Sequence, residues 1–286
     1  MKQKVIFITG ASSGIGYETA VMLAKQGHKV YGAARRMDKM LALKDFGVVP
    51  IQMDVTDEAS IVAGVKAVFE AEGHIDVLVN NAGYGYLGAV ENVTMEEARR
   101  QVEVNVFGLA RLTQLVIPHM RQQGSGRIVN VASIAGKMAL YFGGWYHVSK
   151  YAVEGFSDAL RMELKPFGID VVIIEPGGIR TEWGVIAADH LAESSKGTVY
   201  EQAALNEANA MKYTYSSKLL SPPTVIAKAI CKGVNRKHPK ARYRTGMGSH
   251  SMVFLHWLLP SKWWDALGRG LGKVRIKQKT EERSKK

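Results

Sequence analysis

The sequence predicts an α/β fold in which a parallel sheet carries helices on both of its faces. Up to about residue 180, short β-rich apolar runs alternate with longer segments of helical period. The apolar runs are nearly continuous, which is typical of strands that are buried on both faces. Because crossover connections are right-handed, we expect a single doubly wound, Rossmann-type domain.

Six segments are predicted as strands, and helical segments separate most of them. In chain order the strands are KVIFITG (4–10), KVYGAAR (29–35), VVPIQMD (48–54), IDVLVNNAG (75–83), GRIVNVAS (126–133) and IDVVIIEPGG (169–178). The helical segments are 18–27, 59–72, 95–120 and 146–167. Strands and helices therefore follow the order of a doubly wound sheet up to Gly178.

The pattern weakens after the sixth strand. Residues 182–220 are rich in Ala, Glu, Ser and Asn, and PPTVIAKAICKGV then begins a clearer helix. Since open α/β sheets bind ligands beyond the carboxyl ends of their strands, we predict a helical substrate lid at about 182–220. An ordinary surface connection is the alternative. We expect one domain over residues 1–250 and an aromatic and basic extension over 251–286.

The single cysteine, Cys231, excludes an intramolecular disulfide and a zinc site built from several cysteines, and we expect no metal. The N-terminus has only a short apolar run, without the core of a signal peptide. No stretch of 18 consecutive apolar residues occurs, so we predict no membrane-spanning helix. The predicted location is the cytoplasm.

The formal net charge of +12 is concentrated at the C-terminus. From Pro260 onward nine basic residues face three acidic ones, a net charge of +6. No nucleic-acid-binding motif accompanies this run, so we expect a solvated tail and no nucleic-acid partner. Trp257, Trp263 and Trp264 precede the tail, and the extension could instead lie peripherally on an anionic membrane. Packing on the domain is the alternative that we favour.

The first predicted strand runs directly into TGASSGIG, residues 9–16. The glycines Gly10, Gly14 and Gly16 permit a tight turn and a close approach of the backbone to a ligand. A helix follows at once, and its N-terminus offers free N–H groups and a positive dipole to a pyrophosphate. The context of strand, glycine loop and helix therefore predicts a dinucleotide site.

Three motifs occur together in this chain: TGxxxGxG at the first strand, NNAG at 80–83 and YxxxK at Tyr146 to Lys150. With them, the sequence resembles the classical short-chain dehydrogenases/reductases over about residues 4–181. The resemblance implies a nicotinamide-dependent oxidoreductase that acts on CH–OH or C=O groups. It also implies pairing into homodimers or homotetramers through the helices at 95–120 and 146–167.

The second strand ends in two arginines, where an NAD-binding protein usually has an acidic residue that accepts hydrogen bonds from the ribose 2′-OH. Arg35 and Arg36 can form charge-assisted bonds to a 2′-phosphate, and Ser12 can add another. We therefore expect NADP(H) as the preferred cofactor and NAD(H) as the second candidate. The alternative is that both arginines are simply solvated.

The family resemblance implies the remaining cofactor contacts. Asp54 is expected near the adenine, although it could also cap the end of its strand, and Thr181 is expected at the nicotinamide carboxamide. The full predicted cofactor set is Gly10, Ser12, Ser13, Gly14, Ile15, Gly16, Arg35, Arg36, Asp54, Val55, Asn81, Ala82, Gly83, Tyr146, Lys150, Pro176, Gly177 and Thr181.

Four residues match the Asn-Ser-Tyr-Lys tetrad of the family: Asn105, Ser133, Tyr146 and Lys150. A carbonyl that accepts hydride needs a proton, but a free tyrosine has a pKa near 10. An ammonium about 4 Å away could lower this pKa by several units at an effective dielectric constant of about 20. By resemblance, Lys150 also binds the nicotinamide ribose, Ser133 polarises the substrate oxygen, and Asn105 holds a water that links Lys150 to solvent.

The substrate is predicted from the segments 139–145 and 182–220, which are apolar and aromatic near the expected site. They suggest a hydrophobic alcohol or ketone of steroid, retinoid or lipid type. The alternative is that Tyr141, Phe142 and Trp145 belong to the core or to a subunit contact. Two other functions stay open: a non-catalytic NADP(H)-sensing regulatory protein, and a lipid ketoreductase at the membrane surface.

Overall fold

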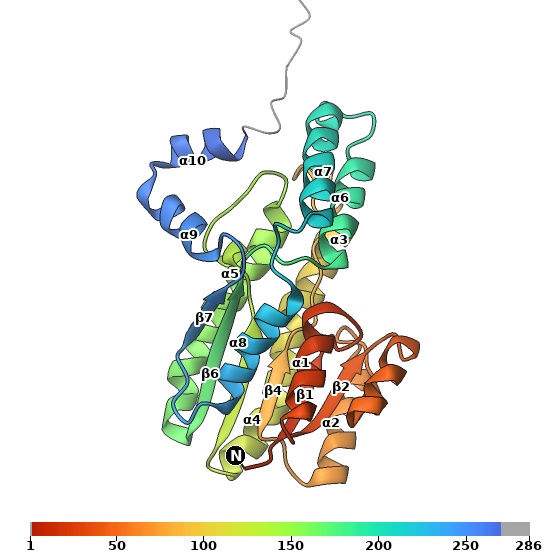
Figure 1. The fold of residues 1–286 in the computed structure, drawn as a ribbon, viewed down its shortest axis with the longest axis vertical. Coiled ribbons are helices and arrows are strands. Elements are labelled where there is room, and N and C mark those ends of the chain that lie inside the picture. Colours follow the sequence, from red (N-terminus) through yellow and green to blue (C-terminus); the bar gives the residue numbers. More distant parts are fainter. Residues whose placement is uncertain (1, 270–286) are drawn as a thin grey trace, which may run out of the picture.

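Seven parallel strands form one sheet in the order β3-β2-β1-β4-β5-β6-β7 in the computed structural model, which describes residues 2–269 (Figure 1). The strands are β1 (Val5–Thr9), β2 (Lys29–Ala34), β3 (Val48–Gln52), β4 (Val77–Asn80), β5 (Gly126–Val131), β6 (Ile169–Pro176) and β7 (Arg242–Thr245). The Rossmann-type prediction is confirmed. All six predicted strands are present, and β7 was not predicted because RYRT has only one apolar residue.

Helices cover both faces of the sheet. The side chains of β1, which point alternately to the two faces, show why the strands are apolar throughout. Ile6 and Ile8 pack with α1 (Gly14–Lys25) and α8 (Pro223–Asn235) on one face. Val5 and Phe7 pack on the other face, where the covering helices are α2 (Glu58–Glu72), α4 (Gly108–Gln122) and α5 (Gly144–Leu164). Because successive side chains point to opposite faces, a strand covered on both sides needs apolar residues at every position.

The helical segment predicted at 95–120 is divided in the structure. It consists of α3 (Met95–Val102), a π-helical turn η2 (Glu103–Phe107) and α4. Three short 3₁₀ segments also occur: η1 (Asp38–Phe46), η3 (Ile134–Gly136) and η4 (Lys165–Phe167). The sequence pattern did not predict these turns, since such short elements carry little periodic signal.

A helical hairpin of α6 (Glu182–Ser194) and α7 (Glu201–Ser216) occupies the segment predicted as a lid. Its interior is lined largely by small residues, Ala187 and Ala188 on α6 against Ala203, Ala204 and Ala208 on α7. Small side chains let the two helices approach closely, but they also explain the weak helical period of the sequence. The hairpin stands at the end of the molecule toward which the strands point (Figure 1).

Two short helices, α9 (Ser249–Leu258) and α10 (Ser261–Gly268), follow β7 and lie toward the same end as the hairpin (Figure 1). They form the described part of the predicted extension, while residues 270–286 lie outside the described residues. Among residues 2–269, no helix combines the length and apolar character needed to cross a bilayer. The domain boundary at residue 250 stays a prediction.

Candidate active site

The glycine loop joins β1 to α1 and leaves no space for a side chain at Gly10 or Gly16. Gly10 and Gly14 have positive φ angles of 70° and 56°, a backbone conformation that glycine adopts without strain. A Cβ at Gly16 would overlap the Gly10 carbonyl oxygen. Ser13 precedes α1 without capping it through its side chain, so the first N–H groups of α1 keep their capacity to bind a pyrophosphate. The predicted dinucleotide loop thus fits its ligand.

Arg36 lies over this loop. Its Nη2 atom donates to the hydroxyl oxygens of Ser12 at 3.3 Å and Ser13 at 3.4 Å. Arg35 and Arg36 are both exposed, and the nearest acidic residue in sequence, Asp38, begins η1. The structure therefore places a guanidinium and two hydroxyl groups together beside the loop, as a phosphate site requires.

The motif at the end of β4 ties that strand to the glycine loop. The Asn81 side-chain amide donates to the carbonyl oxygens of Thr9 at 3.0 Å and Gly10 at 3.3 Å. The Thr9 hydroxyl oxygen accepts hydrogen bonds from the backbone N–H groups of Asn81 and Ala82. Asn81 and Ala82 thus hold the shape of the loop, and their predicted contacts with the cofactor stay a prediction.

Two predicted cofactor residues after β3 also have structural roles. Asp54 accepts hydrogen bonds from the Thr56 N–H at 3.0 Å and its hydroxyl at 2.8 Å, so the capping role considered for it is present. The Val55 carbonyl oxygen lies so close to α4 that a Cβ at Gly108 would overlap it. Ile15, in the first turn of α1, packs on the core.

The carboxyl end of β6 approaches both the loop and the expected catalytic residues. The Ser133 hydroxyl donates weakly to the Pro176 carbonyl at 3.5 Å. A Cβ at Gly14 would lie 3.5 Å from the Thr181 methyl group, so Thr181 stands directly beside the glycine loop. Gly177 has no space for a side chain against Met247 and Ser249. The PG motif thus lies beside Ser133 and Thr181 beside the glycine loop, and their contacts with a nicotinamide stay a prediction.

Ser133, Tyr146 and Lys150 converge at the carboxyl end of β5. Ser133 follows β5, and Tyr146 and Lys150 lie on the first turns of α5. The Lys150 ammonium donates to the Val131 carbonyl at 3.0 Å and lies 5.9 Å from the centre of the Tyr146 ring. The predicted common face of Tyr146 and Lys150 is thus observed.

Asn105 is buried in the π-helical turn η2. Its side-chain amide donates to the Tyr84 carbonyl at 2.8 Å and to the Ser149 hydroxyl at 3.0 Å, and its carbonyl accepts from the Tyr84 N–H at 3.0 Å. It also lies against Gly83. Because π-turns displace a side chain from the regular helical position, η2 explains how Asn105 reaches this site.

The pKa values of Tyr146 and Lys150 differ from the sequence-based expectation. Burial raises the pKa of Tyr146 to about 12, and the neighbouring Ser133 side chain opposes the rise. Burial lowers the pKa of Lys150 to about 8, and the negative charge of Glu154 opposes that fall. We expected Lys150 to lower the phenol pKa, but its ammonium bonds to Val131 while Tyr146 lies among aromatic rings.

Trp183 of α6 covers Tyr146, a contact that the sequence did not predict. The two ring centres are 5.0 Å apart, and Tyr215 of α7 lies 6.1 Å beyond Trp183. A Cβ at Gly85 would lie 2.6 Å from the Trp183 ring and 2.8 Å from the Tyr146 ring, so the loop after β4 closes against both. The helical hairpin therefore lies directly over the predicted acid.

The aromatic segment before Tyr146 supports the hairpin. Phe142 is buried and has a positive φ of 59°, which is unusual for a residue other than glycine. It packs with Leu87 and Leu191, and Tyr141 stacks on it with ring centres 3.9 Å apart. Phe142 is thus a core residue and not part of an open substrate site, which were the two alternatives in the sequence. Tyr141 and Trp145 are half-buried.

A buried ionic cluster lies behind Lys150 and was not predicted. Glu154 is one helical turn after Lys150 and is 4% exposed, and Glu175 of β6 is fully buried. Lys137 lies 2.8 Å from Glu154, and Arg242 of β7 lies 3.0 Å from Glu154 and 3.1 Å from Glu175. The arginines of β7, which made this segment too polar to be predicted as a strand, therefore neutralise buried carboxylates.

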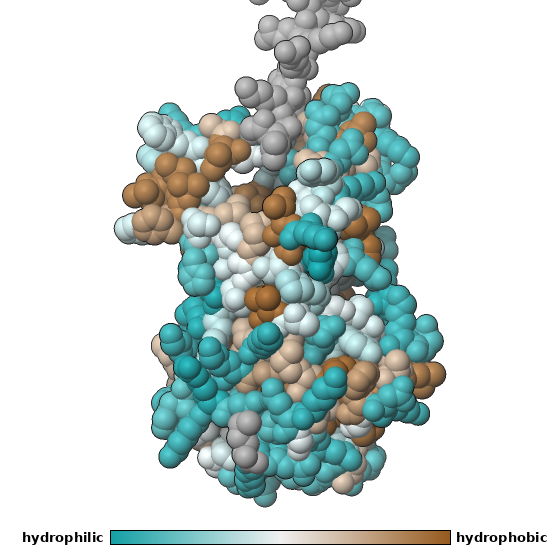
Figure 2. Space-filling view, in the orientation of Figure 1, coloured by the Kyte–Doolittle hydropathy of each residue, from teal (hydrophilic) through white to brown (hydrophobic). Residues whose placement is uncertain are grey.

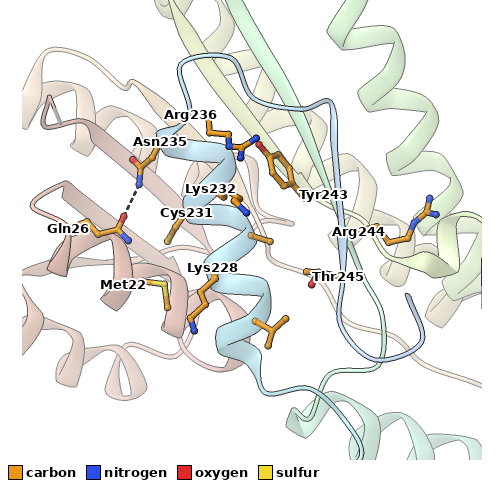
Figure 3. Close-up of a pocket in the computed structure, with 12 residues that line it drawn as sticks. Met22, Gln26, Lys228, Cys231, Lys232, Asn235, Arg236, Tyr243, Arg244 and Thr245 are labelled. Atoms are coloured by element: carbon orange, nitrogen blue, oxygen red, sulfur yellow. Dashed lines mark hydrogen bonds between the residues drawn. The ribbon is translucent and has the colours of Figure 1, made fainter. Parts of the chain in front are cut away.

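A hollow of about 620 Å³ lies between α1, α8 and β7 (Figure 3). Lys228, Lys232, Arg236 and Arg244 line it, and Asn235 donates to Gln26 across one end at 2.7 Å. Its lining includes none of the residues predicted for the cofactor or for catalysis. It is therefore separate from the candidate active site.

Known proteins resemble this chain over most of its length. A family model for short chain dehydrogenases matches residues 4–190. The probable short-chain type dehydrogenase/reductase VdlC of Helicobacter pylori (strain J99) is 40% identical over 265 residues, 92% of this chain and 95% of that protein. The 3-ketodihydrosphingosine reductase of Bacteroides thetaiotaomicron is 37% identical over 253 residues, 86% of this chain and 89% of that protein.

A solved structure agrees with these relatives. A short-chain dehydrogenase from Streptomyces avermitilis has a TM-score of 0.78 and 31% identity, with 94% of this chain and 97% of that chain covered. The chain belongs to the short-chain dehydrogenase/reductase family. It is therefore an oxidoreductase of the hydride-transfer type with a nucleotide-binding Rossmann fold.

Proposed function

We propose that this chain is an NADP(H)-dependent reductase of hydrophobic, lipid-like ketones, which it converts to secondary alcohols. The carrying observation is that Ser133, Tyr146 and Lys150 lie together at the carboxyl end of β5, where Trp183 of the helical hairpin covers Tyr146. An acid, a hydrogen-bond donor and a cation around one position are the groups that a reacting carbonyl needs.

In the proposed reaction, NADPH when bound supplies a hydride to the carbonyl carbon of the substrate. The carbonyl oxygen then gains negative charge, which the Ser133 hydroxyl stabilises by donating a hydrogen bond. Tyr146 donates its proton to this oxygen and completes the alcohol. The Lys150 ammonium, 5.9 Å from the centre of the Tyr146 ring, attracts the phenolate that forms, but this attraction does not outweigh the burial that raises the phenol pKa. The hydrogen bonds of Asn105 hold the loop after β4 in place.

Two observations support reduction with NADPH. A phenol whose pKa is about 12 keeps its proton at neutral pH, and reduction requires that protonated form. The guanidinium of Arg36, joined to Ser12 and Ser13, suits the 2′-phosphate that distinguishes NADPH from NADH. NAD(H) remains the second candidate cofactor.

The substrate class is supported by the surroundings of Tyr146. The rings of Trp183 and Tyr215 lie next to Tyr146 and give this part of the site an aromatic character. Such a site favours an apolar substrate, because burial of apolar surface contributes about 25 cal/mol per Å². One relative is named 3-ketodihydrosphingosine reductase. We therefore place lipid ketones ahead of steroids and retinoids.

The proposal is tested by following the consumption of NADPH and NADH with long-chain 3-keto lipids, steroid ketones and retinal. We expect NADPH-dependent turnover of at least one lipid ketone, lost in Tyr146→Phe. Turnover that persists in this variant would refute the assigned acid. Tight NADPH binding without turnover of any ketone would favour the nucleotide-sensing alternative.

We also propose a homodimer or homotetramer that pairs through α4 and α5, as the family resemblance implies. Val148, Tyr151 and Met162 of α5 are apolar or aromatic and are exposed in the single chain. Light scattering of the full chain should give two or four times the mass of one subunit, and a monomer mass would contradict the pairing.

A further inference from the structure

The helices α9 and α10 expose an aromatic surface that the hydride-transfer site does not use. Five side chains make up this C-terminal surface, and each exposes more than half of its area: Phe254 59%, Trp257 76%, Leu258 58%, Trp263 68% and Leu267 56%. The rings of Phe254 and Trp257 are 5.9 Å apart. Figure 2 shows hydrophobic residues gathered over α9 and α10.

The opposite side of these helices fixes them to the domain. Trp264 is buried, and its indole N–H donates to the Ala139 carbonyl at 2.9 Å. It packs with Ile134 and Met138, beside Met252 and Leu255 of α9. The exposed aromatic residues are therefore held outward by a defined contact, although their burial would be favourable.

The charge next to the C-terminal surface is positive. Lys262 and Arg269 lie on or directly after α10, where Asp265 is the acidic residue. The sequence of 270–286 adds seven basic residues and two acidic ones, a net charge of +5. A second copy placed on this surface would bring like charges together. An anionic partner would instead be attracted, at about 1 kcal/mol per basic residue at a charged membrane.

We propose that the C-terminal surface docks on the headgroup region of an anionic phospholipid bilayer. Tryptophan, phenylalanine and leucine next to lysine and arginine are the residues of helices that lie in the plane of a membrane interface. The surface stands at the same end of the molecule as the α6–α7 hairpin (Figure 1), so docking brings the active-site side toward the bilayer. The inference concerns binding alone and does not depend on the proposed substrate.

The test is co-sedimentation of the full-length protein with phosphatidylcholine vesicles that contain or lack phosphatidylglycerol. We expect binding to the anionic vesicles and much weaker binding to the neutral ones. The double variant Trp257→Glu with Trp263→Glu should lower the partition coefficient at least about tenfold, because it replaces two interfacial anchors by charges. Both residues are exposed, so the variant should fold, as thermal unfolding followed by circular dichroism can verify.

The matched control is Leu41→Glu with Val62→Glu, which makes the same charge change at exposed positions on η1 and α2. It should bind the anionic vesicles like the wild type. Equal binding of the two double variants would overturn the proposal, as would absence of the full-length protein from the anionic vesicle pellet. If Trp257→Glu with Trp263→Glu instead lowers the mass measured by light scattering and vesicles do not bind, the surface is a contact between copies.

Discussion

The phenol group of Tyr146 is the proposed proton donor in the reaction. Its phenol carries the proton that the reduced carbonyl needs, and the change to phenylalanine removes that proton while it preserves the contact with Trp183. We expect Tyr146→Phe to lower kcat by at least about a hundredfold, since general acid catalysis contributes about 10² to 10⁴. The dissociation constant of NADPH, measured by its fluorescence, should stay within about twofold.

The lowered pKa of Lys150, and the charge of Glu154 beside it, predict that activity depends on pH. The Lys150 ammonium loses its proton as the pH rises through its pKa of about 8, whereas Tyr146 keeps its proton in that range. The reductive kcat/KM should therefore fall above about pH 8. The negative charge of Glu154 favours the ammonium, so Glu154→Gln should lower the pKa of Lys150 further and move this fall to lower pH.

Asp158→Asn is the control for this pH profile. Asp158 contacts Arg242 of the same ionic cluster at 2.5 Å, but its charge is not among the causes of the Lys150 pKa shift. Its variant should retain the wild-type profile. If Asp158→Asn and Glu154→Gln shift the profile equally, the effect comes from general disruption of the cluster.

We expect the Arg36 guanidinium to determine the preference for NADPH over NADH. A hydrogen bond to a charged group contributes about 1.5–3 kcal/mol. Arg36→Ala should therefore weaken NADPH binding by about tenfold to about a hundredfold and leave NADH binding nearly unchanged. Titration of nicotinamide fluorescence with each cofactor measures both constants. An equal loss for the two cofactors would show that Arg36 supports the loop through Ser12 and Ser13 and does not read the phosphate.

At the scale of elements, two helical glycines should respond oppositely to alanine. Gly155 is exposed inside α5, and its added Cβ would meet no atom within 4 Å. Gly155→Ala should thus raise the free energy of unfolding by about 0.5–1 kcal/mol, through better helix propensity. Gly16→Ala should lower it by about 1–3 kcal/mol, because its Cβ would overlap the Gly10 carbonyl.

Urea unfolding followed by circular dichroism measures both variants. Gly155 and Gly16 undergo the same chemical change in helices on opposite faces of the sheet, so each variant is the control for the other. A loss of stability in Gly155→Ala would indicate that a subunit contact covers this part of α5. A neutral Gly16→Ala would mean that the glycine loop can shift to accept a side chain.

At the scale of the whole molecule, the α6–α7 hairpin lies over the predicted acid through Trp183. An apolar contact between a long-chain ketone and Trp183 would contribute about 1.5–3 kcal/mol to substrate binding, the usual gain from burying one large apolar side chain. Trp183→Ala should therefore raise KM for a long-chain ketone by about tenfold or more, with little change for a small water-soluble ketone or for NADPH binding. Tyr213→Ala, an exposed position on α7, should alter none of these values.

Much of the fold could be predicted from the sequence, because a strand that is buried on both faces consists of a local run of apolar residues. All six apolar runs became strands, as their composition predicted. The edge strand β7 did not follow, because Arg242 and Arg244 are partners of Glu154 and Glu175, which lie far away in the chain. The π-turn at Asn105 was also missed, since a helix with one extra residue in a turn keeps nearly the same periodicity.

The sequence by itself determined the Rossmann-type sheet and the glycine loop, because these depend on short motifs and on local apolar patterns, and through its family resemblance it named Ser133, Tyr146, Lys150 and Asn105 as candidates. Only the tertiary structure decided what surrounds them. It placed Trp183 on Tyr146 and Glu154 behind Lys150, and it turned Trp257 and Trp263 outward while it buried Trp264. Burial and charge at one residue depend on distant segments, so no local pattern could specify them.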